Sequence, residues 1–261
     1  ISSDLNVMRS SILPNLLSSI NLNINRLFVN GKLFEVGPQF IGVEENEQQM
    51  MASGIQYGQQ YSINWNDDRR LSDVYDVKSD VFFVLSQLNV PTNNIVYDEF
   101  KSNFFHPGKS AQVRIGKNVL GRFGEIHPLA LQKFDIKTNV SAFEIYLDLL
   151  AQFQPKKIST KKAYDNNTLQ AIERDFAFFF PKVIRGIEIE NLIKTIDKKI
   201  IKKVSIFDIF EGNKLPTDMK SIAIKVILQP IEKTFTDSEI EKISNTIIDL
   251  ISKNFEAKLR Q

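Results

Sequence analysis

Hydrophobic positions recur along the first 150 residues with two different spacings. Leu and Ile residues repeat at helical intervals over 13–27, behind Pro14, which suits a first helical turn, and a second apolar helical face covers 76–88. Short apolar runs predict strands, two of them joined as a hairpin by a Gly-Lys-Asn turn, at 32–40, 111–115, 119–126 and 142–150. The polar residues 44–49 predict a surface loop. The first part of the chain is therefore expected to combine helices with a sheet.

The last 90 residues show a more regular alternation of elements. Apolar runs predict strands at 174–180, 204–210, 221–228 and 257–260, and helical spacing appears at 189–196. Thr236 and Glu239 have the spacing of a capping box and open a second helix. The order β-α-β-β-α-β predicts a ferredoxin-like unit. Such a unit packs both helices on one face of its sheet and leaves the other face open.

A polar segment separates these two parts. Residues 152–168 contain four Lys and no acid before Asp165, which is typical of an interdomain linker. We therefore predict an α+β protein with a first domain at 1–152, a linker at 153–167 and a second domain at 168–261.

The composition excludes several classes of protein. Of the 261 residues, 43% are hydrophobic and 25% charged, the balance of a globular protein. The chain has no Cys, which rules out disulfides, thiol catalysis and zinc-thiolate sites and fits the cytoplasm. No apolar run approaches the roughly 20 residues that span a bilayer, so no membrane partner is expected. Because the chain starts without Met, we expect it to be a fragment of a longer protein.

The net charge of +2 hides an asymmetry between the two parts. Residues 1–150 hold 13 basic and 16 acidic side chains, whereas residues 151–261 hold 20 basic and 15 acidic. A basic second part is expected if the partner is a polyanion such as RNA. It is equally expected if an AT-rich genome placed Lys at solvated positions, so charge alone leaves both interpretations open.

The alternation of the second-domain strands indicates which side chains reach the open face. In 221–228, the large aliphatic residues must face the helices, so Ser221, Ala223 and Lys225 face outward. In 204–210 both faces are apolar, but Asp208 cannot be buried without a partner. Alternation then places Asp208 and Phe210 outward, with Phe207 and Ile209 inward. An exposed aromatic ring beside an acid, a hydroxyl and a cation forms a candidate platform for stacking a base, although Phe210 could also merely cover the sheet edge.

Few residues of the first part suggest chemistry. His106 and His127, the two histidines, lack partners at metal-ligand or acid–base spacing, and we expect their rings to bind turn backbone. Gly121 and Gly124 lie within a predicted strand and not before a helix, so they indicate a bulge or a close backbone approach and not a phosphate loop. These four residues therefore indicate no catalytic or metal-binding role.

Several segments together resemble a known family. The C-terminal segments RDFAFFF, VSIFDIFEGNKLPTDMKSIAIKVILQ, EKTFTDSEI and AKLR are similar to the ferredoxin-fold anticodon-binding domain. Upstream, DLNVMRSSILPNLLSSINLNINR, LFEVG, VYDVKSDVFFVL, FHPGKSAQV and LGRFGEIHPLAL resemble the noncatalytic, class II synthetase-like domain of the same family, which implies an antiparallel sheet in the first domain. That family is the β subunits of bacterial phenylalanine–tRNA ligase (phenylalanyl-tRNA synthetase), and the resemblance covers nearly the whole chain in the right order.

The resemblance implies a role within a larger enzyme. It implies a C-terminal piece of a subunit that provides scaffold and anticodon recognition for ATP-dependent attachment of phenylalanine to its tRNA. ATP and magnesium would belong to the holoenzyme, with none bound by this fragment. The partners would be phenylalanine tRNA and the α subunit, in a cytoplasmic assembly of two α and two β subunits. The helix around Leu16 to Leu27 would then be either ordinary core or part of a subunit interface.

The resemblance also implies where the tRNA binds. Its anticodon contacts include the positions of Asp208, Phe210 and Ser221, to which outward alternation adds Ala223 and Lys225. The chain departs from the family pattern at Ser79, where Gly is usual, and at Phe210, where Tyr is usual. The rival interpretations are a stand-alone RNA-binding protein and a ferredoxin-like ligand sensor. Absent Gly-rich ligand turns argue against the sensor.

Overall fold

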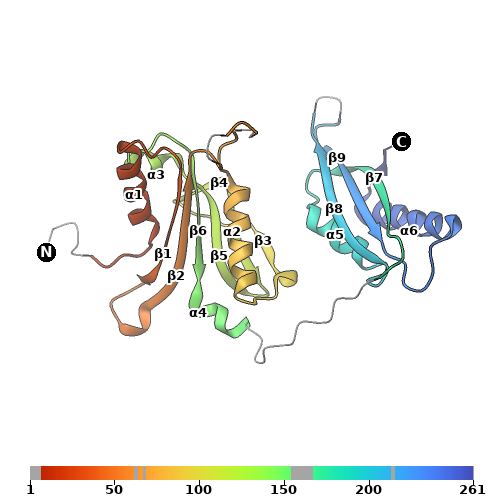
Figure 1. Cartoon of the computed structure of the whole chain (residues 1–261), viewed down its shortest axis with the longest axis horizontal. Coiled ribbons are helices and arrows are strands. Elements are labelled where there is room, and N and C mark those ends of the chain that lie inside the picture. Colours follow the sequence, from red (N-terminus) through yellow and green to blue (C-terminus); the bar gives the residue numbers. More distant parts are fainter. Residues whose placement is uncertain (1–6, 62–63, 67–68, 154–166, 213–214, 261) are drawn as a thin grey trace. The chain divides into compact units, whose positions relative to one another are not determined.

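The chain folds into two compact units, which are described separately. The computed structural model describes residues 7–61, 64–66, 69–153, 167–212 and 215–260. The units comprise residues 1–160 and 161–261 (Figure 1). The division lies within the segment 153–167 that the sequence analysis assigns to a linker, of which 154–166 fall outside the described residues.

The first unit is built on an antiparallel sheet of six strands. Their spatial order is β1-β2-β6-β5-β4-β3. All their pairings are antiparallel. The strands are β1 (Gly31–Phe40), β2 (Gln48–Tyr57), β3 (Val96–Asp98), β4 (Phe105–Ile115), β5 (Asn118–Ile126) and β6 (Val140–Tyr146). The prediction of an antiparallel-sheet domain in the first part of the chain is therefore confirmed.

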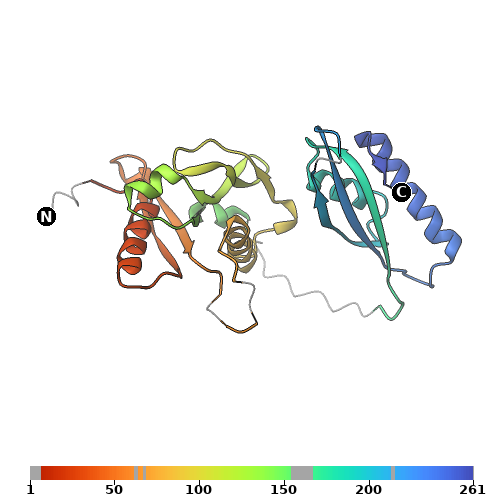
Figure 2. The ribbon, with the colours of Figure 1, turned by 90° about the horizontal axis from the view of Figure 1, so that it is seen from above.

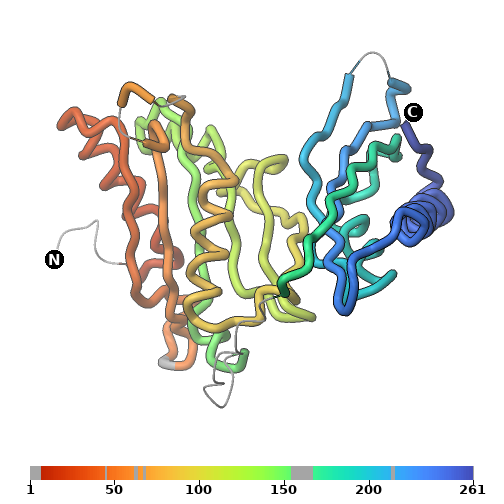
Figure 3. The backbone as a smooth tube through the Cα atoms, turned by 45° about the vertical axis from the view of Figure 1, so that its right-hand side comes forward, coloured from red at the N-terminus to blue at the C-terminus, as the bar shows by residue number. Residues whose placement is uncertain are grey.

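Helices cover both faces of this sheet. They are α1 (Leu13–Asn25), α2 (Val74–Gln87), α3 (Pro128–Lys133) and α4 (Leu147–Leu150), with 3₁₀ turns η2 (Glu45–Glu47), η3 (Thr92–Asn94) and η4 (Ala151–Phe153). Helix α1 shares a core cluster with Ile55 of β2 and Ala142 of β6. Helix α2 shares a separate cluster with Phe143 and Ile145 of β6. Because neighbouring residues of a strand point to opposite faces, α1 and α2 lie on opposite sides of the sheet. Figure 3 shows α2 lying along the strands on the side nearer the viewer.

The apolar helix near the N-terminus belongs to the core. Leu13, Leu16, Leu17 and Ile20 of α1 are all buried. Beyond them the chain exposes Leu22 and the segment 27–29, so the apolar residues of this region divide between core and surface.

Strand β2 is missing from the sequence-based prediction. The loop expected at 44–49 is the turn η2 followed by the first residues of β2. In β2, Gln and Ser residues interrupt the apolar alternation. Large apolar residues recur on only one face of the strand, at Met51, Ile55 and Tyr57. The strand expected at 142–150 ends at Tyr146 and continues as the short helix α4.

The predicted close approach of backbone at the two strand glycines is confirmed. A Cβ on Gly121 would lie 2.5 Å from the carbonyl oxygen of Glu144 in β6. A Cβ on Gly124 would lie 2.4 Å from the Cβ of Ser110 in β4. Both glycines therefore let neighbouring strands come together where a larger residue would collide.

The second unit is the predicted ferredoxin-like arrangement. Its elements are β7 (Ile172–Pro181), α5 (Gly186–Lys194), β8 (Ile201–Phe210), β9 (Met219–Leu228), α6 (Asp237–Phe255) and β10 (Lys258–Leu259). The sheet order is β10-β7-β9-β8. Thr236 and Glu239 form the predicted capping box at the start of α6. The expected α+β fold with a βαββαβ unit is confirmed.

One face of this sheet carries the core of the unit. Alternate residues of β7 and β9 are buried against Ile189 and Ile193 of α5 and Ile247 and Ile251 of α6, namely Phe176, Phe178, Phe180, Ile222, Ile224, Val226 and Leu228. Figure 2 shows the blue helix α6 lying along one side of the sheet. The residues between these core positions therefore point to the other, open face.

Candidate nucleic-acid interface

The register of the sheet places the predicted site residues in neighbouring rows of the open face. Phe210 of β8 lies opposite Ser221 of β9, which lies opposite Phe179 of β7. Lys258 of β10 lies opposite Phe179 and completes this first row. Residues directly opposite each other in antiparallel strands share one face. Two rings thus flank the Ser221 hydroxyl, and Ser221 is only 4% exposed.

The second row adjoins the first. Asp208 lies opposite Ala223, which lies opposite Ala177 of β7. Ala223 and Ala177 have short side chains, so little side-chain volume covers the sheet in this row. The exposed carboxylate of Asp208 lies beside these two alanines, next to the ring of Phe210 in the first row.

The ring of Phe210 lies over a glycine. Phe210 is 46% exposed. A Cβ on Gly212 would lie 2.7 Å from its Cζ and 3.1 Å from its Cε1. Because those distances are shorter than a normal contact, the ring occupies space that a side chain at position 212 would fill.

A β-bulge in β8 sets the side to which Asp208 and Phe210 point. Ile206 lies opposite Ile224, and Asp208 lies opposite the adjacent Ala223, so Phe207 is an extra residue. Phe207, expected from alternation to face the helices, has no partner in the register and is 56% exposed at the bulge, so it does not belong to the core. Ile209 lies opposite the buried Ile222, on the helix side as expected, but 55% of it is exposed.

The third row is charged. Lys225 of β9 lies between Asp175 of β7 and Ser205 of β8. Its Nζ donates a hydrogen bond of 2.7 Å to Oε2 of Glu173 and lies 3.9 Å from Oδ1 of Asp175. The hydrogen bond to Glu173, followed by the negative charges of Asp175 and Glu173, raises the pKa of Lys225 above its ordinary value. The predicted cation is thus held by two carboxylates that the sequence analysis did not select.

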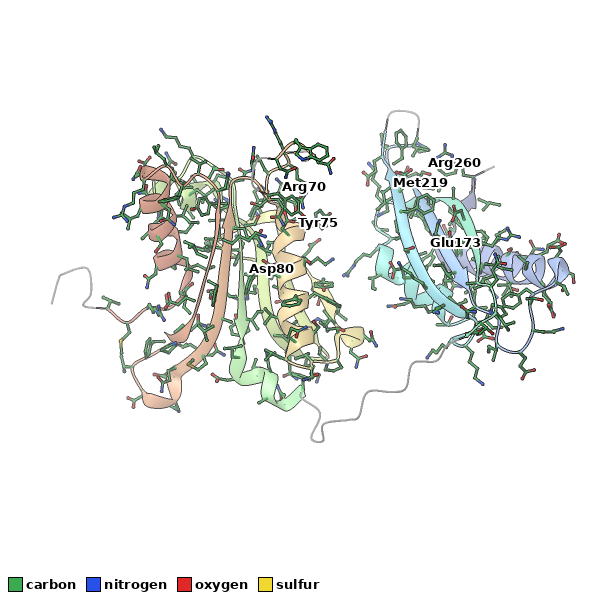
Figure 4. All side chains as sticks on the ribbon, viewed as in Figure 1. Arg70, Tyr75, Asp80, Glu173, Met219 and Arg260 are labelled. Carbon is green, nitrogen blue, oxygen red and sulfur yellow. The ribbon has the colours of Figure 1, made fainter. Side chains whose placement is uncertain are left out.

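A hollow of about 480 Å³ lies beside the first row. Its lining consists of Phe179, Leu215, Pro216, Asp218, Met219 and Lys258. Figure 4 labels Met219, Arg260 and Glu173 on this unit, with Met219 and Arg260 near one another and Glu173 further along the sheet. Sequence reasoning missed Phe179 and Glu173. Counting in steps of two along β7 puts both on the face opposite the buried Phe176, Phe178 and Phe180.

The two histidines of the first unit bind backbone, as predicted. Nδ1 of His106 accepts a hydrogen bond of 3.1 Å from the Gly108 amide. Nδ1 of His127 accepts one of 3.2 Å from the Leu129 amide. Among the described residues, no group of three or more His, Cys, Asp or Glu could hold a metal ion. In the same part of the chain, no helix is long and apolar enough to cross a membrane.

An ion pair organises the start of α2. Arg70 donates two hydrogen bonds to Asp76, of 2.8 Å to Oδ2 and 2.6 Å to Oδ1. The hydrogen bond from Arg70 is the largest cause that holds the pKa of Asp76 below its ordinary value. Figure 4 labels Arg70 and Tyr75 at this end of α2 and Asp80 further along it. The pair is structural, because it joins the preceding loop to the first turn of the helix.

Comparisons with known proteins divide the chain in the same way. Residues 1–147 match the model of the phenylalanyl tRNA synthetase beta chain CLM domain. Residues 167–260 match the model of the ferredoxin-fold anticodon binding domain.

Relatives match over the full length of the chain. The phenylalanine–tRNA ligase β subunits of Rhodospirillum rubrum and Paramagnetospirillum magneticum are 37% and 36% identical over 260 residues. That of Bartonella henselae is 35% identical over 265 residues. Each match covers 100% of this chain and 32–33% of the relative, so the chain spans about a third of the length of these relatives.

Similarity to solved structures is weak. The crystal structure of pyrrolysyl-tRNA synthetase from Desulfitobacterium hafniense aligns with 55% of this chain and 48% of its own. The TM-score is 0.42 at 14% identity, too low to assign a fold or a function.

Proposed function

Because this chain belongs to the family of phenylalanyl-tRNA synthetase β chains, we propose that the open face of its second unit binds the anticodon of phenylalanine tRNA. The observation that carries the proposal is the row formed by Phe210, Ser221 and Phe179, with Asp208 beside it. The relatives match over the whole chain as ligase subunits, which favours this function over a stand-alone RNA-binding or ligand-sensing protein.

The exposed ring of Phe210 provides the stacking surface. An unstacked base gains roughly 1–3 kcal/mol by stacking on an aromatic side chain. The ring is nearly half exposed and only its tip approaches Gly212, so ring surface remains accessible to a base. Where Tyr is usual in the family, Phe210 keeps the aromatic surface and lacks one hydroxyl.

Polar groups around the ring supply hydrogen bonds to the base. The carboxylate of Asp208 offers two acceptor oxygens, which suit the N–H groups on the edge of a guanine. Ser221 is only 4% exposed between the two rings, so its hydroxyl would meet a base only if a ring moves aside, whereas Ala223 leaves room for the base above the sheet. Lys225 lies at the border of this set, where its charge is engaged by Glu173 and Asp175.

The rest of the activity is assigned to a larger complex. In this proposal the chain is the C-terminal part of a β subunit that joins an α subunit in an assembly of two α and two β subunits. The complex attaches phenylalanine to tRNA in the cytoplasm with ATP and magnesium, while this chain contributes no catalytic residue and no metal ligand. Its domains are proposed to be 1–152 and 168–261, joined by the linker 153–167.

The test is tRNA binding by the complex that contains this chain. Phe210→Ala and Asp208→Asn are compared with Phe83→Ala, which removes an exposed ring from α2 of the first unit. Loss of stacking is expected to weaken binding about 5- to 150-fold. Asp208→Asn is expected to reduce the preference for the natural first anticodon base, and Phe83→Ala to change neither. Unchanged affinity and base preference in both site variants would place the anticodon elsewhere.

A further inference from the structure

We propose that Glu173 and Asp175 are specificity-determining residues of the open face, which hold Lys225 and keep RNA phosphates away from it. Binding then depends on the bases that reach Phe210 and Asp208, and not on the charge of the RNA backbone. This inference rests on the proposed function and adds two residues of β7, a strand from which the sequence analysis took no site residue.

The geometry places both carboxylates around one cation. Glu173 and Asp175 are two residues apart in β7, so their side chains share the open face. Asp175 is directly opposite Lys225 in β9, and Glu173 reaches the same Nζ from the neighbouring row at 2.7 Å. Both carboxylates are more than half exposed, so solvent and RNA can reach them.

The charges of this cluster do not favour phosphate. Two carboxylates and one ammonium sum to −1, and the exposed Asp208 adds another negative charge in the adjacent row. Lysines stand at the margins instead, where Lys203 lies opposite Ile227 and Lys258 lies opposite Phe179. A phosphate is therefore repelled from the centre of the face and attracted to its edges.

This arrangement matters because a lone lysine would bind any RNA. Phosphate neutralisation is sequence-independent and supplies nearly all non-specific affinity. An accessible Lys225 next to Phe210 would strengthen the binding of correct and incorrect anticodons alike. The ratio of the two affinities would fall where the added phosphate contact competes with correct placement of the base. Neutralising Lys225 with two acids removes that contribution and leaves the selective contacts.

The experiment compares charge removal on the two sides of the sheet. Glu173→Gln with Asp175→Asn frees Lys225 on the open face. Glu188→Gln with Glu190→Gln, in α5 on the helix side, changes the net charge equally and leaves Lys225 held. A third variant adds Lys225→Met to the open-face pair. Each is made in the complex that contains this chain and is assayed with phenylalanine tRNA and with the same tRNA carrying an altered first anticodon base, at 50–200 mM salt.

The open-face pair is expected to bind both tRNAs about 3- to 10-fold more tightly at low salt, with the larger gain for the altered tRNA. The logarithmic salt dependence should steepen by about one unit, the effect of one added phosphate contact. Adding Lys225→Met should return affinity and salt dependence to those of the original protein.

Two outcomes would overturn the inference. One is that the open-face pair behaves like the α5 pair, since the gain would then reflect net charge alone. The other is that the gain persists after Lys225→Met. Phe210→Ala, measured alongside, separates the two proposals. If Phe210→Ala weakens binding while the open-face pair changes nothing, the proposed function stands and only this inference fails. If Phe210→Ala has no effect, the proposed function itself fails.

Discussion

Replacing Gly212 by Ala should displace the ring of Phe210 without removing it. The added Cβ would lie 2.7 Å from Cζ, whereas ordinary contact begins at 3.4 Å, so the ring tip must move by at least about 0.7 Å (3.4 − 2.7). The ring end belongs to a half-exposed side chain, so it can rotate away at little cost to the fold.

The expected loss is a fraction of the stacking energy. A gap of 0.5–1 Å forfeits about a quarter to a half of a dispersion contact. Applied to a stacking contribution of roughly 1–3 kcal/mol, this gives about 0.3–1.5 kcal/mol, or about a 2- to 10-fold weaker affinity. The effect of Gly212→Ala should therefore be smaller than that of Phe210→Ala.

The assay is binding of phenylalanine tRNA by the complex at fixed salt, with thermal unfolding measured in parallel. Gly108→Ala is the control, because a Cβ there would lie 3.7 Å from its nearest neighbour, the ring of His106. The unfolding temperature should stay unchanged in both variants. If Gly212→Ala binds as tightly as the original protein while Phe210→Ala does not, the ring is not fixed in the position described, and the reasoning is refuted.

Three further substitutions test the fold. Phe178→Ala removes a fully buried ring and should destabilise the second unit by about 3–5 kcal/mol, seen by calorimetry as a lower transition for that unit alone. Gly121→Ala should cost about 1–3 kcal/mol in the first unit, since its Cβ meets the backbone of β6; an unchanged melting temperature would contradict this. Asp76→Asn should lower the free energy of unfolding by about 1–2 kcal/mol at neutral pH. This value is kept small because Arg70 is 46% exposed and solvent screens the ion pair. Because Arg70 lowers the pKa of folded Asp76, this stability is present above the unfolded pKa and lost as pH falls through the folded one, so the two proteins should converge in acid.

Local patterns in the sequence predict most elements of the second unit. The buried positions alternate at Phe176, Phe178 and Phe180 of β7 and at Ile222, Ile224 and Val226 of β9, because one face of each strand packs on the helices and the other does not. The capping box of α6 is equally local, since the side chains of Thr236 and Glu239 each accept a hydrogen bond from the other's backbone N–H. The fold of this unit is therefore predictable from neighbours in the sequence.

The first unit is less predictable because its sheet is covered on both sides. In β2, Ser53 and Gln56 are buried beside Met51 and Ile55, so polar residues occupy positions that alternation reserves for apolar ones. Gly54 is required by the ring of Phe143 in β6, which lies 89 residues further along the chain (143 − 54). No local pattern encodes that contact, and the strand escapes prediction.

The candidate site shows the same limit. Alternation groups Asp208, Phe210 and Ser221 on one face, but Glu173 and Asp175 join them only through the pairing of β7 with β9. Their distance from Lys225 is a property of the register. Sequence reasoning therefore finds the residues of β8 and β9 and misses those that β7 contributes.

Because of the bulge at Phe207, the side of the sheet to which Asp208 and Phe210 point depends on the number of residues in β8. Ile206, before the bulge, and Ile209, after it, both lie on the helix side, although three positions separate them. Deleting one residue here would restore simple alternation and turn one half of β8 over. Either Asp208 and Phe210 would rotate beneath the helices, or Val204 and Ile206 would rotate into solvent. Insertions and deletions in this strand should thus damage the fold far more than substitutions at its exposed positions.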